Sequence, residues 1–117
     1  MVKNMLTLKV RTIEAKRHLQ TKILFWVLFV GSRGRTNRIR IISVLRKRPR
    51  NRNQLATELG MDYKSIQHHI KILEGNNLVK KIGNHYGVTY YVSELFMHNE
   101  IAFDEIRDKL KIENEDA

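Results

Sequence analysis

The sequence of 117 residues contains no cysteine. Disulfide bonds, thiolate chemistry and zinc sites built from Cys are therefore excluded, as is usual for a protein of a reducing compartment. We expect a cytoplasmic protein on this basis. The length allows one domain with a single modest core, so a second folded domain is not expected.

Long hydrophobic runs are also missing. The longest, residues 23–30 (ILFWVLFV), has eight residues, whereas a membrane-spanning helix needs about 20. A signal peptide is disfavoured as well, because the charged leader before this run would be unusually long and no A-x-A cleavage site follows it. We predict no membrane association.

Acidic residues are scarce over most of the chain. Residues 1–92 contain 19 Lys and Arg but only four Asp and Glu, whereas residues 93–117 contain three basic and eight acidic residues. A net charge of +10 in so small a protein indicates a polyanionic partner, with the basic part facing the phosphates. Basic residues that only solubilise a surface are the alternative, but such surfaces usually mix both signs.

Proline occurs once, at Pro49, so cap residues and glycines mark the helix ends. Apolar residues at helical spacing predict a first helix from about residue 7 or 12 to residue 30. Its second half is apolar nearly all round and should be buried against the body or against a second subunit. Thr36 is the expected N-cap of a second helix that ends by residue 48.

Two further helices are predicted close together. A short helix would begin after Asn53 and end at Gly60, and a longer one would follow Asp62 and run to about residue 74. The buried face of the longer helix is defined by a stripe at i, i+4 and i+7, namely Ile66, Ile70 and Leu73.

Two β-type runs, residues 78–82 and 88–92, predict a hairpin with a five-residue polar tip. Ser93 then caps a last helix that runs to about residue 111. The apolar stripe of this helix would either fold back on the core or join two subunits. We favour self-association, because the first helix also has surplus apolar surface. The expected dimer interface consists of Trp26, Phe96, Phe103, Ile106 and Leu110.

This order of elements defines the expected fold class. It is a mainly α protein with a small β-hairpin (α+β), namely a winged helix-turn-helix with extra N- and C-terminal helices. Residues 1–33 would form an N-terminal packing or dimerisation helix, and residues 34–92 the DNA-binding domain. Residues 93–117 would form a C-terminal dimerisation helix with an acidic tail.

The longer helix of the pair would be the recognition helix, which enters the major groove of double-stranded DNA. Its outward side chains suit base edges and phosphates: Gln bonds adenine, Lys reaches guanine or phosphate, and Ser bonds either. An ordinary solvated polar face is the alternative. The predicted contacts are Tyr63, Lys64, Ser65, Gln67, His68 and Lys71.

The hairpin would act as a wing that touches a neighbouring minor groove or backbone, unless it is a plain solvated hairpin. Its predicted contacts are Lys80, Lys81, Asn84 and His85. Clusters of Arg before the helix-turn-helix should bind phosphate, which strengthens binding without reading sequence and makes it salt-sensitive. The predicted phosphate contacts are Arg38, Arg46, Arg48, Arg50 and Arg52.

From about residue 34 to residue 92 the sequence resembles the ArsR-type winged-helix regulators of archaea and bacteria, above all the small archaeal members. The resemblance is carried by NQLATELGMDYKSIQHHIKILEGNNLVKK, residues 53–81, and by YGVTYYVS, residues 86–93. It implies that His69 helps to hold the recognition helix in place and that His68 is the more exposed of the two. It also implies a transcription regulator.

No metal or other cofactor is predicted. Metal-sensing members of the family carry a Cys-containing motif in the positioning helix, which this sequence lacks. Other members bind metal through Asp and His on the last helix, a pattern that His98 with Glu94 or Asp104 does not reproduce. The sequence identifies no effector.

We expect a homodimeric regulator that binds specific DNA sequences. No enzyme is expected, because no Ser, Cys or carboxylate stands near the histidines at a motif spacing and no Gly-rich phosphate loop follows a strand. Two alternatives use the same fold: a non-specific chromatin-associated protein and a winged-helix module that binds proteins. The basic face argues against the second, because protein interfaces are usually poor in lysine.

Overall fold

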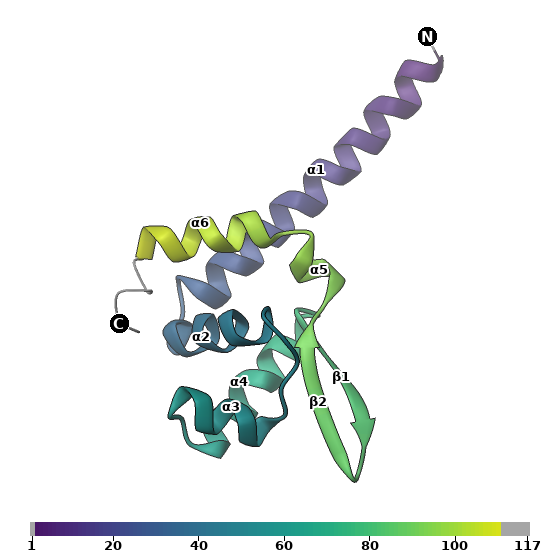
Figure 1. Ribbon diagram of the computed structural model, residues 1–117. Coiled ribbons are helices and arrows are strands. Elements are labelled where there is room, and N and C mark those ends of the chain that lie inside the picture. Colours follow the sequence, from purple (N-terminus) through teal and green to yellow (C-terminus); the bar gives the residue numbers. More distant parts are fainter. Residues whose placement is uncertain (1, 111–117) are drawn as a thin grey trace.

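The computed structural model describes residues 2–110 and shows a helical body with a two-stranded hairpin (Figure 1). The helices are α1 (Val2–Phe29), α2 (Arg35–Leu45), α3 (Arg52–Leu59), α4 (Tyr63–Gly75), α5 (Glu94–Met97) and α6 (Glu100–Leu110). The strands are β1 (Val79–Asn84) and β2 (Gly87–Val92). This arrangement confirms the expected winged helix-turn-helix with extra helices at both ends.

A single hydrophobic core joins the helices to the base of the hairpin. α1 contributes only its C-terminal end to this core, through Phe25, Leu28 and Phe29. The helix-turn-helix contributes the inner faces of α2, α3 and α4. On α4 the predicted stripe is buried as expected: Ile66, Ile70 and Leu73.

α1 projects beyond the body over most of its length (Figure 1). It begins earlier than predicted because no Gly or Pro interrupts the first residues. Thr12 lies inside the helix, and its hydroxyl donates to the Leu8 carbonyl oxygen. Its apolar second half is buried on one side only, since Trp26 and Val27 are exposed. Within residues 2–110, no helix has both the length and the hydrophobicity needed to cross a membrane.

Two predicted helix caps are wrong. Thr36 does not cap α2, because Gly34 precedes the helix in a left-handed conformation with φ 84°. Asn53 does not cap α3, because Asn51 does so: its side chain accepts the Gln54 backbone N–H at 2.8 Å, and the Gln54 side chain accepts the Asn51 N–H at 2.8 Å. This reciprocal pair is a capping box.

The other predicted boundaries lie close to the observed ones. Gly60 ends α3 with φ 63°, and Asp62 caps α4. Ser93 caps α5, with its hydroxyl oxygen accepting the Phe96 N–H at 3.1 Å. α2 ends before the expected residue 48, because the Lys47 N–H bonds to the Val44 carbonyl in a tightened last turn.

β1 and β2 pair antiparallel from Val79 and Val92 at the base to Asn84 and Gly87 at the end. The tip therefore has two residues rather than the predicted five. Gly83 lets the first strand continue toward the tip, because its φ of 123° is open to glycine and a Cβ there would overlap the Gly87 carbonyl oxygen.

The predicted last helix is interrupted, and α6 packs against α1 of the same chain (Figure 1). The expectation that Phe96 and Phe103 join two subunits is wrong, because both are fully buried inside the chain. The Phe96 ring lies 6.1 Å from that of Phe25, and the Phe103 ring lies 5.2 Å from that of Phe29, centroid to centroid. The predicted end near residue 111 lies outside the described residues.

Candidate nucleic-acid interface

The N-terminus of α4 is fixed by Asp62. The Asp62 carboxylate accepts the Ser65 hydroxyl at 2.8 Å and the Ser65 backbone N–H at 3.0 Å. These two hydrogen bonds hold the pKa of Asp62 below its ordinary value. Since its proton is already engaged, the Ser65 hydroxyl offers an approaching ligand mainly an acceptor oxygen.

The predicted recognition-helix residues all reach the surface of α4. The exposed ones are Tyr63, Lys64, His68 and Lys71. The partly exposed ones are Ser65 and Gln67. The opposite face of α4 packs into the core and includes His69. The buried His69 and the exposed His68 agree with what the family resemblance implies for this pair.

Arg38 is an internal residue, only 3% exposed. Its guanidinium donates to the Leu28 carbonyl at 2.9 Å, to the Arg33 carbonyl at 3.0 Å and to the Ser32 hydroxyl. Its Nη1 also lies 3.4 Å from Nδ1 of His69. Arg38 therefore ties the end of α1 to the recognition helix, and it does not serve as the predicted phosphate contact.

The environment of His69 disfavours its charged form. Burial is the main cause of a pKa below the ordinary value, and the positive charge of Arg38 adds to it. A neutral His69 can accept a hydrogen bond from Arg38 through Nδ1. The recognition helix is thus held by a contact that requires an unprotonated imidazole.

Arg46 joins α2 to α6 and is also withdrawn from the predicted phosphate contacts. It donates to Asp104 at 2.6 Å and to Glu100 at 3.1 Å. Its guanidinium carbon lies 5.9 Å from the Phe96 ring centroid and 5.5 Å from that of Phe103. The hydrogen bond from Arg46 lowers the pKa of the Asp104 carboxyl group.

Arg50 is likewise internal, at 7% exposed. It donates to Glu58 at 3.0 Å and to the carbonyl oxygens of Val44 and Arg48 at 2.8 Å and 2.6 Å. It therefore fixes the connection between α2 and α3 and does not serve as the predicted phosphate contact. Arg48 is different, because its side chain is exposed and only 3.7 Å from Glu58 in a surface pair.

Arg52 lies between the recognition helix and the wing. It is partly buried, and its guanidinium donates to the hydroxyls of Tyr90 on β2 and Tyr63 on α4. This link could not be predicted from local sequence, because Arg52 and Tyr90 are 38 positions apart.

The wing carries its four predicted residues on the surface: Lys80, Lys81, Asn84 and His85. Nζ of Lys81 lies 3.6 Å from a Glu74 carboxylate oxygen, and the Asn84 side chain accepts the Tyr86 N–H at 2.9 Å. Tyr86 itself is 86% exposed, with its ring centroid 4.1 Å from that of His85. The sequence prediction did not include this aromatic residue as a contact, although its position between Asn84 and Gly87 indicated that it lies at the hairpin tip.

A hollow of about 360 Å³ separates the wing from the start of the recognition helix. Tyr63 lines it on the α4 side, Asn51 and Asn53 line it at the start of α3, and His85 and Tyr86 line it from the wing. The recognition helix and the wing thus border one concave surface.

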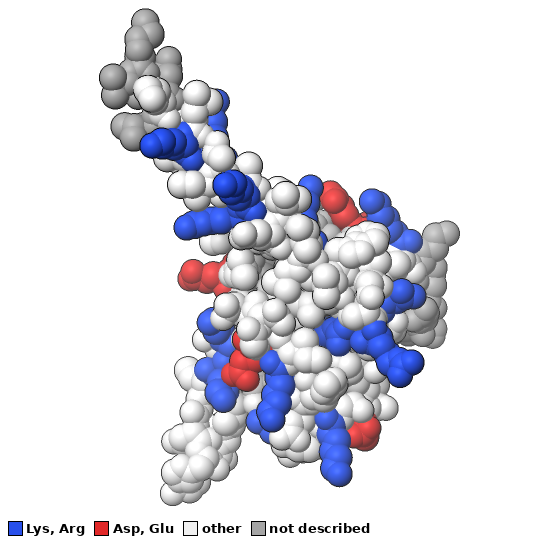
Figure 2. All heavy atoms as spheres, turned by 180° about the vertical axis from the view of Figure 1, so that it is seen from behind, with Lys and Arg blue, Asp and Glu red and all other residues white. Residues whose placement is uncertain are grey.

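Basic side chains extend well beyond this concave surface. Figure 2, which shows the molecule from behind, has Lys and Arg on both α1 and the body, with few acidic side chains among them. The wing tip carries neither kind of charge, since residues 83–88 contain no Lys, Arg, Asp or Glu. Its polar contacts must come from amide, imidazole and hydroxyl groups.

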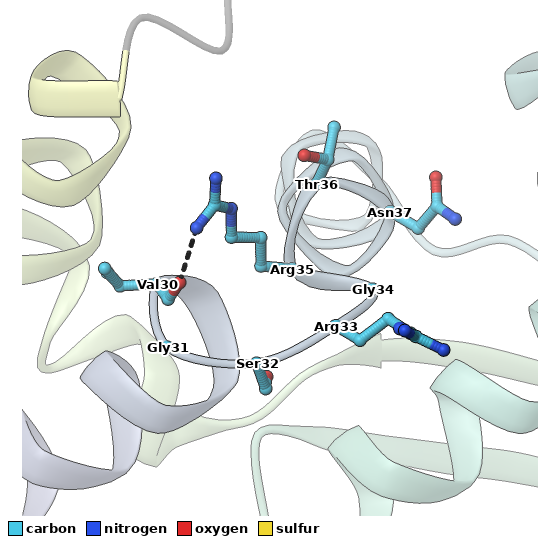
Figure 3. Close-up of a pocket in the computed structure, with 8 residues that line it drawn as sticks. All are labelled: Val30, Gly31, Ser32, Arg33, Gly34, Arg35, Thr36 and Asn37. Atoms are coloured by element: carbon cyan, nitrogen blue, oxygen red, sulfur yellow. Dashed lines mark hydrogen bonds between the residues drawn. The ribbon is translucent and has the colours of Figure 1, made fainter.

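A second hollow of about 610 Å³ lies at the loop between α1 and α2 and is lined by residues 30–37 (Figure 3). Arg35 folds over it and donates to the Val30 carbonyl at 2.9 Å, while Arg33 and Asn37 point away from Arg35 (Figure 3). Arg33 and Arg35 are both exposed, so this loop adds positive charge beside α2.

The remaining predicted dimer residues line an apolar groove of about 280 Å³ between α1 and α6. Trp26, from α1, is 59% exposed at this groove. Ile106 and Leu110, from α6, are half-buried there. In the part of the chain that the structure describes, no group of three His, Cys, Asp or Glu side chains is placed to hold a metal ion.

The fold and this surface define a winged helix-turn-helix of the type found in transcription regulators. Residues 35–81 match the sequence profile described as bacterial regulatory protein, arsR family. The helix-turn-helix segment of this chain is therefore similar to that of the arsR family of regulatory proteins. No curated protein matches the chain.

Solved structures of low sequence identity share the fold. The transcriptional regulator BldR from Sulfolobus solfataricus is 17% identical with a TM-score of 0.62, over 92% of this chain and 80% of that one. Reduced HlyU from Vibrio cholerae is 14% identical with a TM-score of 0.60, over 81% and 95%. A homodimeric winged helix-turn-helix DNA-binding domain from Mycobacterium bovis is 16% identical with a TM-score of 0.59, over 80% and 84%.

Proposed function

We propose that this protein is a homodimeric transcription regulator that binds specific sequences of double-stranded DNA. The observation that carries the proposal is the outer face of α4, within the segment that matches the arsR profile, where Lys64 and Lys71 are exposed and Gln67 is partly exposed. These side-chain types bond the edges of purine bases in the major groove. A DNA-binding regulator would work in the cytoplasm.

The wing supports simultaneous contact with a second part of the DNA. Lys80 and Lys81 would neutralise phosphates, and Asn84 and His85 would approach the minor groove or the backbone. Arg48, which is exposed just before α3, would add a phosphate contact. α5 and α6 contain five acidic residues and two basic ones, so this end of the molecule would face away from DNA.

Dimerisation is part of the proposal. The Mycobacterium bovis domain of similar fold is homodimeric, and here the exposed Trp26 and the groove lined by Ile106 and Leu110 form an apolar surface between α1 and α6. Two recognition helices related by a two-fold axis would read two half-sites about one helical turn apart. The operator would then be roughly palindromic.

Fluorescence anisotropy tests the proposal directly. The protein is titrated into a duplex from upstream of its own gene and into a random duplex, at two salt concentrations. We expect binding that weakens with salt and prefers the upstream duplex by well over tenfold. The variant Lys64→Ala/Gln67→Ala should lose this preference, because each removed base contact is worth about 1 to 3 kcal/mol of discrimination.

The matched control is Lys16→Ala/Gln20→Ala, which removes the same residue types from the exposed surface of α1. It should keep the preference for the upstream duplex. Equal affinity of the wild-type protein for both duplexes would instead indicate a chromatin-associated protein. An absence of binding to either duplex would indicate a protein partner.

A further inference from the structure

The wing is joined to the helix-turn-helix by the residues that enter α3. The backbone of Arg50 forms an isolated β-bridge with Tyr90, with N–H to O distances of 3.1 and 2.8 Å. Two residues later, Arg52 donates through Nε and Nη2 to the Tyr90 hydroxyl, at 2.9 and 2.7 Å. β2 is therefore held to the start of α3 by the backbone hydrogen bonds of Tyr90 and by its hydroxyl group.

The same Arg52 guanidinium reaches the recognition helix. Its Nη1 donates to the hydroxyl of Tyr63, the first residue of α4, at 3.4 Å. The guanidinium carbon lies 5.5 Å from the Tyr90 ring centroid and 6.0 Å from that of Tyr63. One planar cation thus contacts both arms of the concave surface, the wing and the recognition helix.

The exposure of these residues separates their roles. Tyr90 is 1% exposed, so its ring and hydroxyl serve the interior contact with Arg52 rather than contact with a ligand. All three guanidinium nitrogens of Arg52 donate to tyrosine hydroxyls within the chain. The geometry fits a structural link better than the phosphate contact expected from the sequence.

We propose that Arg52 is a positioning residue that fixes the wing relative to the recognition helix through Tyr90 and Tyr63. This inference rests on the proposed function, because the fixed angle lets α4 and the wing engage one DNA site together. Binding energy that would otherwise be spent on ordering the wing is then available for DNA. This role requires the planar, forked guanidinium group, which donates to both hydroxyls at once. A Lys ammonium is a single point charge and cannot reproduce that geometry.

The substitution Arg52→Lys separates positioning from phosphate binding. A phosphate contact tolerates Lys, and Arg52→Ala would then lower the salt slope of binding by about 0.9. A positioning residue does not tolerate Lys. We therefore expect Arg52→Lys and Tyr90→Phe each to weaken specific DNA binding by about tenfold, the order expected for lost charge-assisted hydrogen bonds, with the salt slope unchanged.

The matched control is Tyr91→Phe, which removes the same hydroxyl from the next residue of β2, whose side chain is exposed. It should bind DNA as the wild type does. Hydrogen exchange of the free protein gives a second readout that does not depend on DNA. Amides of β2 should exchange faster in Tyr90→Phe and Arg52→Lys than in Tyr91→Phe, because the wing has lost its anchor.

The outcomes distinguish this inference from the proposed function. DNA binding by Arg52→Lys at wild-type affinity, or equal exchange in Tyr90→Phe and Tyr91→Phe, would overturn the positioning role while leaving a DNA-binding regulator intact. A wild-type protein that binds no duplex would overturn the proposed function. Faster exchange of β2 in the two variants would then still support the anchoring of the wing by Arg52.

Discussion

Gly34 stands where the loop from α1 meets the recognition helix. Its φ of 84° is a conformation that side chains rarely adopt, and a Cβ there would lie 2.6 Å from Cε1 of the buried His69. We predict that Gly34→Ala lowers the free energy of unfolding by about 1 to 3 kcal/mol, from backbone strain and displacement of His69. Urea unfolding followed by circular dichroism measures this loss.

Gly75 provides the matched control, because it ends α4 without a positive φ and an added Cβ meets nothing within 4 Å. Gly75→Ala should leave stability unchanged or raise it by up to about 1 kcal/mol, as alanine is the better helix former. Equal effects of the two substitutions would contradict the strain assigned to Gly34.

His69 makes folding stability depend on pH. Its pKa lies below the ordinary value of 6.5, mainly through burial and then through Arg38 and His68. The unfolded chain takes up this proton near pH 6.5 and the folded protein only at lower pH, so acid favours unfolding between the two values. Stability should be highest above pH 6.5 and fall as the pH drops below it. Denaturant midpoints from pH 7.5 to pH 5 test this.

The variant His69→Gln should show a flatter profile over that range, because Gln has no proton to gain and its side-chain oxygen can accept from Arg38. The control His85→Gln, at the exposed wing tip, should keep the wild-type profile, because His85 is not among the groups that lower the pKa of His69. A wild-type profile in His69→Gln would show that another group titrates. The lower limit of pH 5 avoids Asp62 and Asp104, whose pKa values are below ordinary carboxyl values.

The basic residues show what a sequence can and cannot predict at this scale. Charge pattern and helical spacing placed Lys64 and Lys71 correctly on the surface of α4. The same charge pattern grouped Arg38, Arg46 and Arg50 with them as phosphate contacts. Their roles depend on partners that local sequence does not reveal, such as Asp104, which is 58 positions from Arg46.

At the scale of elements, α6 is held to α1 by buried aromatic rings. Phe103 is fully buried, with its ring centroid 5.2 Å from those of Phe29 and Phe96. Phe103→Ala should lower the free energy of unfolding by about 3 to 5 kcal/mol, through lost burial and the cavity left behind. Ile101→Ala, at an exposed position of the same helix, should have little effect.

Unfolding of both variants can be followed by the fluorescence of Trp26, the only tryptophan, at several protein concentrations. If α6 packs within its own chain, the loss caused by Phe103→Ala is independent of concentration. A loss that disappears at high concentration would mean that Phe103 packs between subunits. Phe103→Leu, which retains most of the volume, serves as a milder variant should the alanine variant not fold.

Element type was predictable here and element partners were not. The apolar period and the caps at Asp62 and Ser93 identified the helices, because these signals are local. The stripe through Phe96 and Phe103 showed that the last helix packs on something, but a stripe carries no information about its partner. The short hairpin tip escaped prediction because two glycines, Gly83 and Gly87, read as loop although they belong to paired strands.

At the scale of the molecule, α1 is the element whose apolar surface a single chain leaves largely uncovered. The helix runs for 28 residues, and most of it projects beyond the body (Figure 1). Its exposed apolar side chains include Met5, Leu8, Val10, Ile13, Leu19, Ile23, Trp26 and Val27. An apolar surface of this extent usually marks an interface, which supports a second copy of the chain as its partner in the proposed dimer.

The proposed dimer can be tested by substitution of Trp26, a large aromatic side chain that is exposed at the groove between α1 and α6. A charge at the centre of an apolar interface costs at least about 2 kcal/mol, so Trp26→Glu should weaken dimerisation at least about thirtyfold. Sedimentation equilibrium measures this. Ile82→Glu, a change of the same kind at an exposed position of the wing, should leave the dimer intact.

The DNA-binding consequence follows from symmetry. A monomeric Trp26→Glu protein would lose the gain from engaging two linked half-sites, so its affinity for a full palindromic site should fall close to its affinity for a half-site. Its affinity for the half-site should stay at the wild-type level, since α4 and the wing are unchanged. If Trp26→Glu remained a dimer and bound the full site normally, the subunits would have to meet through a surface other than the groove between α1 and α6.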